Sequence, residues 1–342
     1  MQKLANRRWC IEVSCHIIQS VLLRSPPRFI HPSHVNLFVE CIFDNGGKFD
    51  KNAVDPNMQK NSTLLHIVKT GIDSPALVFI PGLSGTTRYW QGRLGGLEKN
   101  YRILLVDPLG FGESPRPWSR YTVDCHVDAL YQTLKNEKQF VLVGHSMGTL
   151  LSIAYAARHP EQVTRLVLLS IPFFGSAKDA RRFFSSQPVP FGWFFSNMAL
   201  AALVCIITRR FFGWLVPYIR RDLPREVAVD IAKHSWRSFT SSFWEVICNY
   251  DAKRDADALS DLPVLCIHGD QDDTAPLAGA MTLANGRQNW KALILSGVDH
   301  HPWLRAPQVC QDAVASPFAA SNGESYVNPV NFVQVWKATV TP

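Results

Sequence analysis

The pattern of hydrophobic positions divides the chain into short apolar runs separated by longer amphipathic stretches. Six of these runs are apolar on both alternating faces, which is typical of parallel strands covered on both sides of a sheet. They span residues 75–82, 101–110, 140–146, 163–172, 262–270 and 291–297. Helical segments separate the first four runs, so the pattern predicts an α/β fold with a doubly wound, mostly parallel sheet.

The spacing of the predicted strands breaks once, between residues 176 and 260. Residues 176–256 contain twelve Lys or Arg against seven Asp or Glu, and they hold fifteen of the 38 aromatic residues. Because ligands of open α/β sheets bind at the carboxyl ends of the strands, we interpret this stretch as a helical lid over those ends.

The apolar segment 191–207 lies within the predicted lid. A membrane span needs about 20 apolar residues, and polar positions interrupt this segment, so we expect a buried lid helix. Peripheral contact with a membrane is the alternative, because Arg209 and Arg210 follow the segment and aromatic residues lie nearby.

The chain is expected to divide into five parts. They are an N-terminal extension (1–60), a first core part (61–175), the lid (176–260), a second core part (261–315) and a C-terminal tail (316–342) without an assigned role. The basic N-terminus lacks the long apolar run and small-residue cleavage site of a secretory signal. We therefore expect a cytoplasmic location, and anchoring of the extension to a membrane is the alternative.

The charge and the cysteine content of the chain limit the kinds of partner and cofactor that we expect. The net charge of the 342 residues is +7, but no Lys/Arg run exceeds two residues and no nucleic-acid-binding motif occurs, so a nucleic-acid partner is not expected. The eight cysteines include no CxxC pair, which argues against a metal site and a disulfide framework. We expect reduced cysteines, a buried Cys266, and neither a metal nor another cofactor.

One short stretch combines a strand, a serine and a helix. The run FVLV (140–143) leads directly into Gly144-His145-Ser146-Met147-Gly148, and the amphipathic run TLLSIAYAA follows. A turn tight enough to hold a serine in a strained backbone position leaves no room for side chains on either side, which explains the two glycines. The helix start adds a positive dipole end beside the hydroxyl. The stretch therefore predicts a nucleophile elbow.

With this elbow, the chain resembles the lid-bearing branch of the α/β-hydrolase superfamily, which includes esterases, epoxide hydrolases, carbon–carbon bond hydrolases and iminopeptidases. The resemblance covers residues 64–312 and rests on four further motifs. These are PGLSG (81–85), DPLGFGESPRP (107–117), HGDQDDTAP (268–276) and SGVDHHPWLRAP (296–307). It implies an α/β-hydrolase fold with a helical lid insertion.

The resemblance also implies the roles of five residues. Ser146 corresponds to the nucleophile, His300 to the base that activates it and then protonates the leaving group, and Asp272 to the acid that orients the imidazole. The backbone N–H groups of Leu83 and Met147 correspond to the oxyanion hole, where each donor contributes about 3 kcal/mol to the stability of the transition state.

Six other residues compete for these roles. The offsets from Gly269 and Gly297 favour Asp272 and His300 over neighbours of the same type, and we interpret the remaining competitors as supporting residues. A catalytic role for Asp107 is kept as an alternative. The six are Asp107, His145, His268, Asp270, Asp273 and His301.

The chain departs from the family pattern at two places. Pro81-Gly82 replaces the usual His-Gly before the oxyanion loop, and Arg305 stands where a Glu is common. Neither change removes a catalytic atom, but with both changes the sequence does not determine which polar groups surround the substrate pocket.

A serine nucleophile suits attack on a carbonyl, whereas family members that open a saturated carbon use an aspartate at the elbow. We therefore expect a serine hydrolase acting on an ester, thioester, lactone or amide of a bulky apolar small molecule. One alternative is a biosynthetic enzyme of a natural-product pathway in which His300 drives condensation or cyclisation by acid–base chemistry. Another is a non-catalytic receptor with a hydrolase fold.

Overall fold

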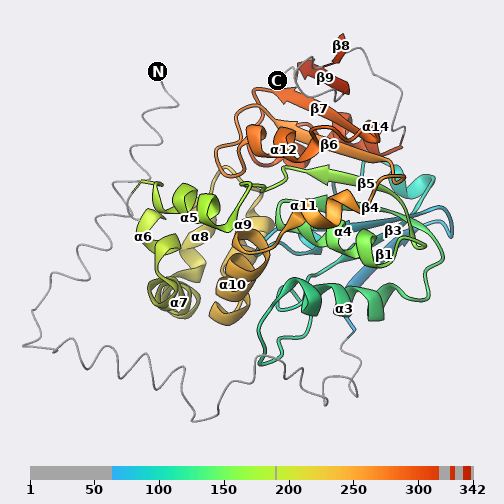
Figure 1. The fold of residues 1–342 in the computed structure, drawn as a ribbon. Helices are drawn as coiled ribbons and strands as arrows, with labels where there is room; N and C mark the ends of the chain where they lie inside the picture. The colour runs from blue at the N-terminus through green and yellow to red at the C-terminus, as the bar shows by residue number, and fades with distance from the viewer. Residues whose placement is uncertain (1–63, 189–190, 316–323, 328–333, 340–342) are drawn as a thin grey trace, which may run out of the picture.

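The strands of the chain form one sheet in which most neighbouring strands are parallel. The computed structural model describes residues 64–188, 191–315, 324–327 and 334–339, so the predicted extension (1–60) lies outside the described residues. The strand order is β1-β3-β2-β4-β5-β6-β7-β9-β8, and only the edge pairs β1–β3 and β8–β9 are antiparallel (Figure 1). The doubly wound, mostly parallel sheet expected from the sequence is therefore confirmed.

All six predicted strands are present. They are β2 (Ala76–Ile80), β3 (Arg102–Val106), β4 (Phe140–His145), β5 (Val163–Leu169), β6 (Val264–Gly269) and β7 (Trp290–Ser296). Three further strands at the edges were not predicted. They are β1 (Ile67–Gly71), β8 (Glu324–Val327) and β9 (Gln334–Thr339). β1 escapes the pattern because its second half, KTG, is exposed and polar.

The connection between β2 and β3 differs from the expected helix. It contains only two short 3₁₀ turns, η1 (Thr87–Tyr89) and η2 (Leu97–Lys99). The stretch GRLGG (92–96) explains the difference, because its three glycines all take positive φ values that an α-helix does not allow. The chain thus crosses from β2 to β3 without a covering α-helix.

Alternating residues of the strands supply two separate cores. On one face, Val78 and Ile80 pack with α3 (Val123–Leu134), α4 (Met147–Arg158) and α12 (Leu277–Ala284). On the other face, Leu77 and Phe79 pack with α13 (Pro302–Arg305), α14 (Pro307–Ala315) and α9 (Arg225–Ile231). Because both faces are covered, most residues of the six predicted strands are apolar, as the sequence pattern requires.

The described residues of the segment predicted as a lid form a series of short helices joined by turns and loops. The segment follows β5 and precedes β6, and we call residues 177–257 the helical insertion. Its helices are α5 (Ala177–Ser185), α6 (Phe191–Ser196), α7 (Met198–Ile207), η3 (Thr208–Phe212), η4 (Gly213–Leu215), α8 (Val216–Ile219), α9 (Arg225–Ile231), α10 (Trp236–Ser242), η5 (Phe243–Cys248) and α11 (Ala252–Asp257). Figure 1 shows α5–α10 grouped on the side toward which the arrows of β5 and β7 point. A gating role for the insertion stays a prediction.

The expectation of a buried helix over residues 191–207 is wrong. The segment is split into α6 and α7, and α7 buries only a narrow face of small residues. Ala201, Ala202 and Cys205 are buried, whereas Leu203 and Ile206 on the opposite face are exposed. Overall hydrophobicity predicted burial, but the neighbouring helices have room only for the small side chains.

Buried histidines tie the insertion to the core. His126 on α3 lies with its Nε2 3.0 Å from Ser242 Oγ on α10, and His234 lies with its Nδ1 3.2 Å from Ser84 Oγ. Burial lowers the pKa of His126 to about 3 and that of His234 to about 4. Both imidazoles are therefore neutral in the folded protein at neutral pH.

We predict that stability falls as the pH drops below 6.5. There the unfolded chain protonates His126 but the folded chain does not, so each such histidine lowers the free energy of unfolding by up to about 1.4 kcal/mol per pH unit. Urea unfolding over a pH series should show a shallower dependence for His126→Gln. Ser242→Ala is the control, because it removes the partner and leaves the titrating group. An unchanged slope in His126→Gln contradicts the prediction.

Candidate active site

Ser146 occupies a strained turn between β4 and α4. Its φ of 50° and ψ of −122° place it outside the regions that non-glycine residues usually adopt. A Cβ on Gly148 would lie 2.3 Å from the carbonyl oxygen of Ile80, so only glycine allows α4 to start this close to β2. The hydroxyl is therefore held at the amino end of α4, where β4 ends.

A continuous hydrogen-bonded chain links Ser146, His300 and Asp272. His300 Nε2 lies 3.0 Å from Ser146 Oγ, and His300 Nδ1 lies 2.8 Å from Asp272 Oδ2. A carboxylate only accepts hydrogen bonds, so Nδ1 carries the proton and Nε2 accepts from the serine hydroxyl. The three residues come from the loops after β4, β6 and β7, which end at the same edge of the sheet.

Asp272 is an ionised carboxylate with a fully buried side chain. Its Oδ1 accepts hydrogen bonds from the amides of Thr274 and Ala275, at 3.0 and 2.8 Å. Burial opposes ionisation, but hydrogen bonds from His268 and His300 outweigh it and hold the pKa of the carboxyl well below its usual range. Asp272 is thus a fixed negative charge beneath the imidazole of His300.

His268 supports Asp272 from the end of β6. Its Nε2 lies 2.8 Å from the carbonyl oxygen of Ala275 and 3.3 Å from Asp272 Oδ2. A carbonyl only accepts, so Nε2 bears the hydrogen and the shorter contact is its main bond. The predicted supporting position of His268 matches this geometry.

His145 holds the backbone of His300 and packs on Tyr89. Its Nε2 donates to the carbonyl oxygen of His300 at 2.9 Å, and its ring stacks on Tyr89 with the centroids 4.6 Å apart. Burial lowers the pKa of His145 to about 3 and that of His301 also well below its usual value. Both rings are neutral neighbours of the Ser146–His300–Asp272 chain.

The two residues expected to supply oxyanion-hole amides, Leu83 and Met147, belong to segments that lie next to Ser146. Met147 is the first residue of α4, and Leu83 follows Gly82, whose Cβ position would be 2.9 Å from Ser146 Cβ. Within the described residues, neither amide is assigned an acceptor. Their role as donors to an oxyanion therefore stays a prediction.

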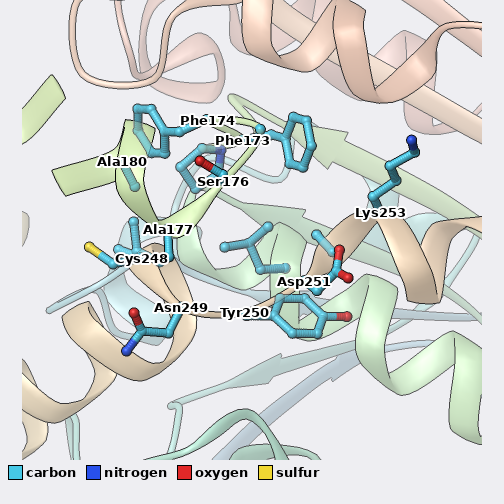
Figure 2. A pocket seen from close by; sticks show the side chains of 15 residues that line it. Phe173, Phe174, Ser176, Ala177, Ala180, Cys248, Asn249, Tyr250, Asp251 and Lys253 are labelled. Atoms are coloured by element: carbon cyan, nitrogen blue, oxygen red, sulfur yellow. The ribbon is translucent and has the colours of Figure 1, made fainter. Parts of the chain in front are cut away.

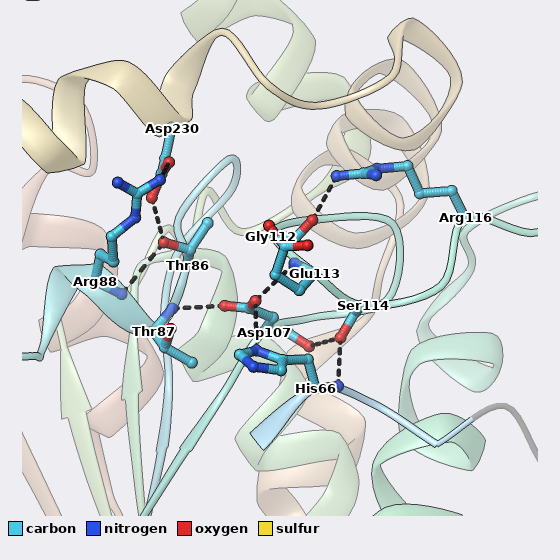
Figure 3. Close-up of polar contacts among 10 residues, drawn as sticks. All are labelled: His66, Thr86, Thr87, Arg88, Asp107, Gly112, Glu113, Ser114, Arg116 and Asp230. Carbon is cyan, nitrogen blue, oxygen red and sulfur yellow. Dashed lines mark hydrogen bonds and ion pairs between the residues drawn. The ribbon is translucent and has the colours of Figure 1, made fainter. Parts of the chain in front are cut away.

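A buried carboxylate of the insertion anchors the loop that carries Leu83. Asp230 on α9 accepts a 2.5 Å hydrogen bond from Thr86 Oγ1, pairs with Arg88, and lies 3.2 Å from Lys233 Nζ. Asp230 is 3% exposed, and Figure 3 shows it above Thr86 and Arg88. The insertion thus contacts the loop after β2 directly.

Asp107 anchors the same loop from the core side. Its Oδ1 accepts the amide of Thr87 at 2.6 Å, and its Oδ2 accepts the amide of Glu113 at 2.8 Å and lies 3.0 Å from His66 Nδ1 (Figure 3). Within the described residues, its hydrogen-bond partners lie in segments next to β1–β3, and none belongs to the Ser146–His300–Asp272 chain. The geometry supports the interpretation of Asp107 as a supporting residue rather than a catalytic one.

The other competing residues lie outside the hydrogen-bonded chain. Asp270 binds Ser296 Oγ and the amide of Gly297, and His301 lies 3.5 Å from the hydroxyl of Tyr89. Arg305, which stands where a Glu is common in the family, pairs with Asp299. Among the residues that the structure describes, no group of three His, Cys, Asp or Glu side chains is arranged to hold a metal ion.

Sequence reasoning did not identify Asp230, Thr86, Ser84 or His234 as part of this site. Asp230 and Thr86 are 144 positions apart, and Ser84 and His234 are 150 apart. The one local signal is an aspartate on the apolar side of α9, next to the buried Val227 and Ala228.

A cavity of about 370 Å³ lies next to the site but does not include it. Its walls come from α4, the loop after β5, α5 and the η5–α11 segment, and Figure 2 shows Phe173, Phe174 and Tyr250 around it. None of Ser146, Asp272 and His300 lines the cavity. The hydrogen-bonded chain, rather than this volume, is the candidate reaction centre, because it joins a hydroxyl to an imidazole and a carboxylate.

Comparisons with known proteins agree with the fold. A family model described as alpha/beta hydrolase fold matches residues 75–300. The chain is 28% identical over 305 residues to the Arabidopsis thaliana protein named "Probable lysophospholipase BODYGUARD 4", covering 79% of this chain and 70% of that protein. To "Probable lysophospholipase BODYGUARD 5" of the same plant it is 26% identical over 257 residues, covering 66% of this chain and 57% of that protein.

A solved structure of a thermophilic esterase from Thermogutta terrifontis is also similar. It has a TM-score of 0.59 and 18% sequence identity, covering 73% of this chain and 91% of that chain. This likeness shows the shared fold alone.

We predict that Asp230→Asn slows the reaction of Ser146 with a fluorophosphonate probe by about ten- to a hundredfold, because the loop that carries Leu83 loses its anchor. Arg88 and Lys233 are both partly exposed, so water can solvate them and the protein should still fold. Glu226→Gln on the same helix is the control, since Glu226 pairs with Arg93 instead. Equal labelling rates in wild type and Asp230→Asn contradict the prediction.

Proposed function

We propose that this chain, which belongs to the alpha/beta hydrolase fold family, is a serine hydrolase that cleaves an ester, thioester, lactone or amide of an apolar substrate. The observation that carries the proposal is the unbroken hydrogen-bonded chain from Ser146 Oγ through His300 to Asp272. A serine hydroxyl is a weak nucleophile alone, and an adjacent oriented base is what activates it.

The proposed reaction passes through an acyl-enzyme. His300 Nε2 takes the proton of Ser146 as Oγ attacks the substrate carbonyl, and Asp272 stabilises the imidazolium that forms. The amides of Leu83 and Met147 donate to the oxyanion of the tetrahedral intermediate. His300 then protonates the leaving group. Water, deprotonated by the same nitrogen, attacks the acyl carbonyl and restores the serine with release of a carboxylic acid.

The side chains that surround Leu83 favour a substrate with an apolar acyl group. Leu83 packs against an apolar cluster of the insertion that includes Phe184, Phe195 and Phe243. An acyl chain bound beside the oxyanion amides would contact this cluster and gain about 0.8 kcal/mol for each buried CH₂ group. The names of the two plant relatives make a lysophospholipid, a single-chain ester, the first substrate to test.

The alternative of acid–base condensation or cyclisation uses the same histidine. It would need a reactive carbonyl compound held away from water, with His300 as the proton carrier. The alternative of a non-catalytic receptor has less support, because the nucleophile, the imidazole and the carboxylate are all in hydrogen-bonding positions. The hydrolase proposal uses every one of these contacts.

We predict that a fluorophosphonate probe labels the wild-type protein and that Ser146→Ala abolishes both labelling and hydrolysis. The hydrolytic rate should fall by about 10⁴-fold or more, because the covalent intermediate cannot form. Ser152→Ala is the control, since Ser152 is also buried on α4 but its hydroxyl bonds the carbonyl of Gly148. Equal labelling of wild type and Ser146→Ala overturns the proposal.

We predict that His300→Ala and Ser146→Ala impair turnover to a similar extent. The two residues act as one unit, so losing either one removes the same catalytic step and their effects on the rate are not additive. Rates with lysophosphatidylcholine and with aryl esters of increasing acyl length provide the measurement. Turnover that survives Ser146→Ala but not His300→Ala would instead support the acid–base alternative.

A further inference from the structure

The outer face of the helical insertion exposes an unusual number of large apolar side chains. Within the described residues, ten of the thirteen exposed large hydrophobic side chains lie between residues 193 and 219. We define the apolar outer face by six of them. They are Leu203, Ile206, Ile207, Phe211, Trp214 and Tyr218. Contiguous exposed apolar surface of this kind marks an interaction site rather than ordinary surface variation.

Packing within the protein does not account for these side chains. The run Met198–Ile219 is helical over 22 residues, and only 17% of its most apolar stretch is buried. Its inner side, with Ala201, Ala202 and Cys205, packs toward the rest of the insertion. The helix is therefore attached to the protein along one side and exposes the other. This is typical of a helix that lies on an apolar phase rather than one that crosses it.

The apolar outer face is cationic at its margins. Residues 198–221 contain four arginines and no Asp or Glu. Arg220 pairs with Asp222, whereas within the described residues Arg209, Arg210 and Arg221 have no carboxylate partner. Arg209 and Arg221 donate to backbone carbonyls, and Arg210 lies over the ring of Phe211.

The positive charge of these arginines distinguishes between a second copy of the chain and an anionic surface as the partner of the apolar outer face. Two copies of the chain packed face to face would bring these uncompensated arginines together, which disfavours a dimer. An anionic surface would instead pair with them. Trp214 and Tyr218 add amphipathic rings of the kind found at the boundary between lipid headgroups and acyl chains.

We propose that the apolar outer face docks this protein on an anionic phospholipid bilayer. The axis of α7 lies along the membrane plane, Ile206 and Trp214 enter the boundary between headgroups and acyl chains, and the arginines contact lipid phosphates. The proposal concerns binding alone and does not depend on the assignment of Ser146 as a nucleophile.

Flotation of the full chain with vesicles tests the proposal, using phosphatidylcholine vesicles with and without phosphatidylglycerol. Binding to the anionic vesicles is expected, and it should weaken as salt is added. Ile206→Glu and Trp214→Glu should each lower the partition coefficient by about tenfold or more. Ser146→Ala protein should bind as wild type does.

Ile72→Glu is the matched control, because Ile72 is 46% exposed like Ile206 but lies in the turn between β1 and β2. Arg209→Gln combined with Arg210→Gln provides a second test that keeps the apolar side chains, and it should reduce binding to anionic vesicles only. Thermal unfolding of each variant identifies any that fails to fold.

Three results overturn the proposal. The first is a wild-type chain that does not float with anionic vesicles, and the second is equal loss of binding in Ile72→Glu and Ile206→Glu. The third is a wild-type dimer that Ile206→Glu converts to a monomer without any vesicle binding, which would assign the face to a second copy.

Discussion

The close approach of β4, α4 and β2 at Ser146 is the constraint on which the rest of the site depends. A strand and a helix joined through one strained residue place the serine hydroxyl beyond the sheet edge and aim the first amide of α4 at the same point. The missing side chain of Gly148 lets the backbone of Ile80 come within contact distance. The loop after β2 then runs beside Ser146, because β2 and β4 are direct neighbours in the sheet. The strand order reverses around β2, so this is also the point where an open α/β sheet leaves a crevice.

Electrostatics at this point are organised around one buried charge. Asp272 is ionised inside the protein because the amides of Thr274 and Ala275 and two imidazoles solvate it. The neighbouring His145 and His301 are kept neutral by burial and add no competing charge. In the proposed mechanism, Asp272 is therefore the negative charge that stabilises an imidazolium formed on His300.

The helical insertion faces two environments. Its inner side packs an aromatic cluster against Leu83 and anchors the oxyanion loop through Asp230, while α7 exposes apolar side chains on its outer side. The same connections that hold the insertion to the core also hold the loop beside Ser146.

Much of this arrangement is determined by local sequence. Six apolar runs were sufficient to predict six buried strands, because each strand is covered on both faces, and the glycines around Ser146 predicted the elbow because the turn has no room for a Cβ. The motif offsets also selected Asp272 and His300, which the fold brings within hydrogen-bonding distance of each other and of Ser146. Tertiary structure alone decided the anchoring of the oxyanion loop, since Thr86 and Asp230 meet across 144 residues without a local pattern. It also decided which side of α7 is buried, because hydrophobicity along a chain reports affinity for an apolar environment but not whether protein or another phase provides it.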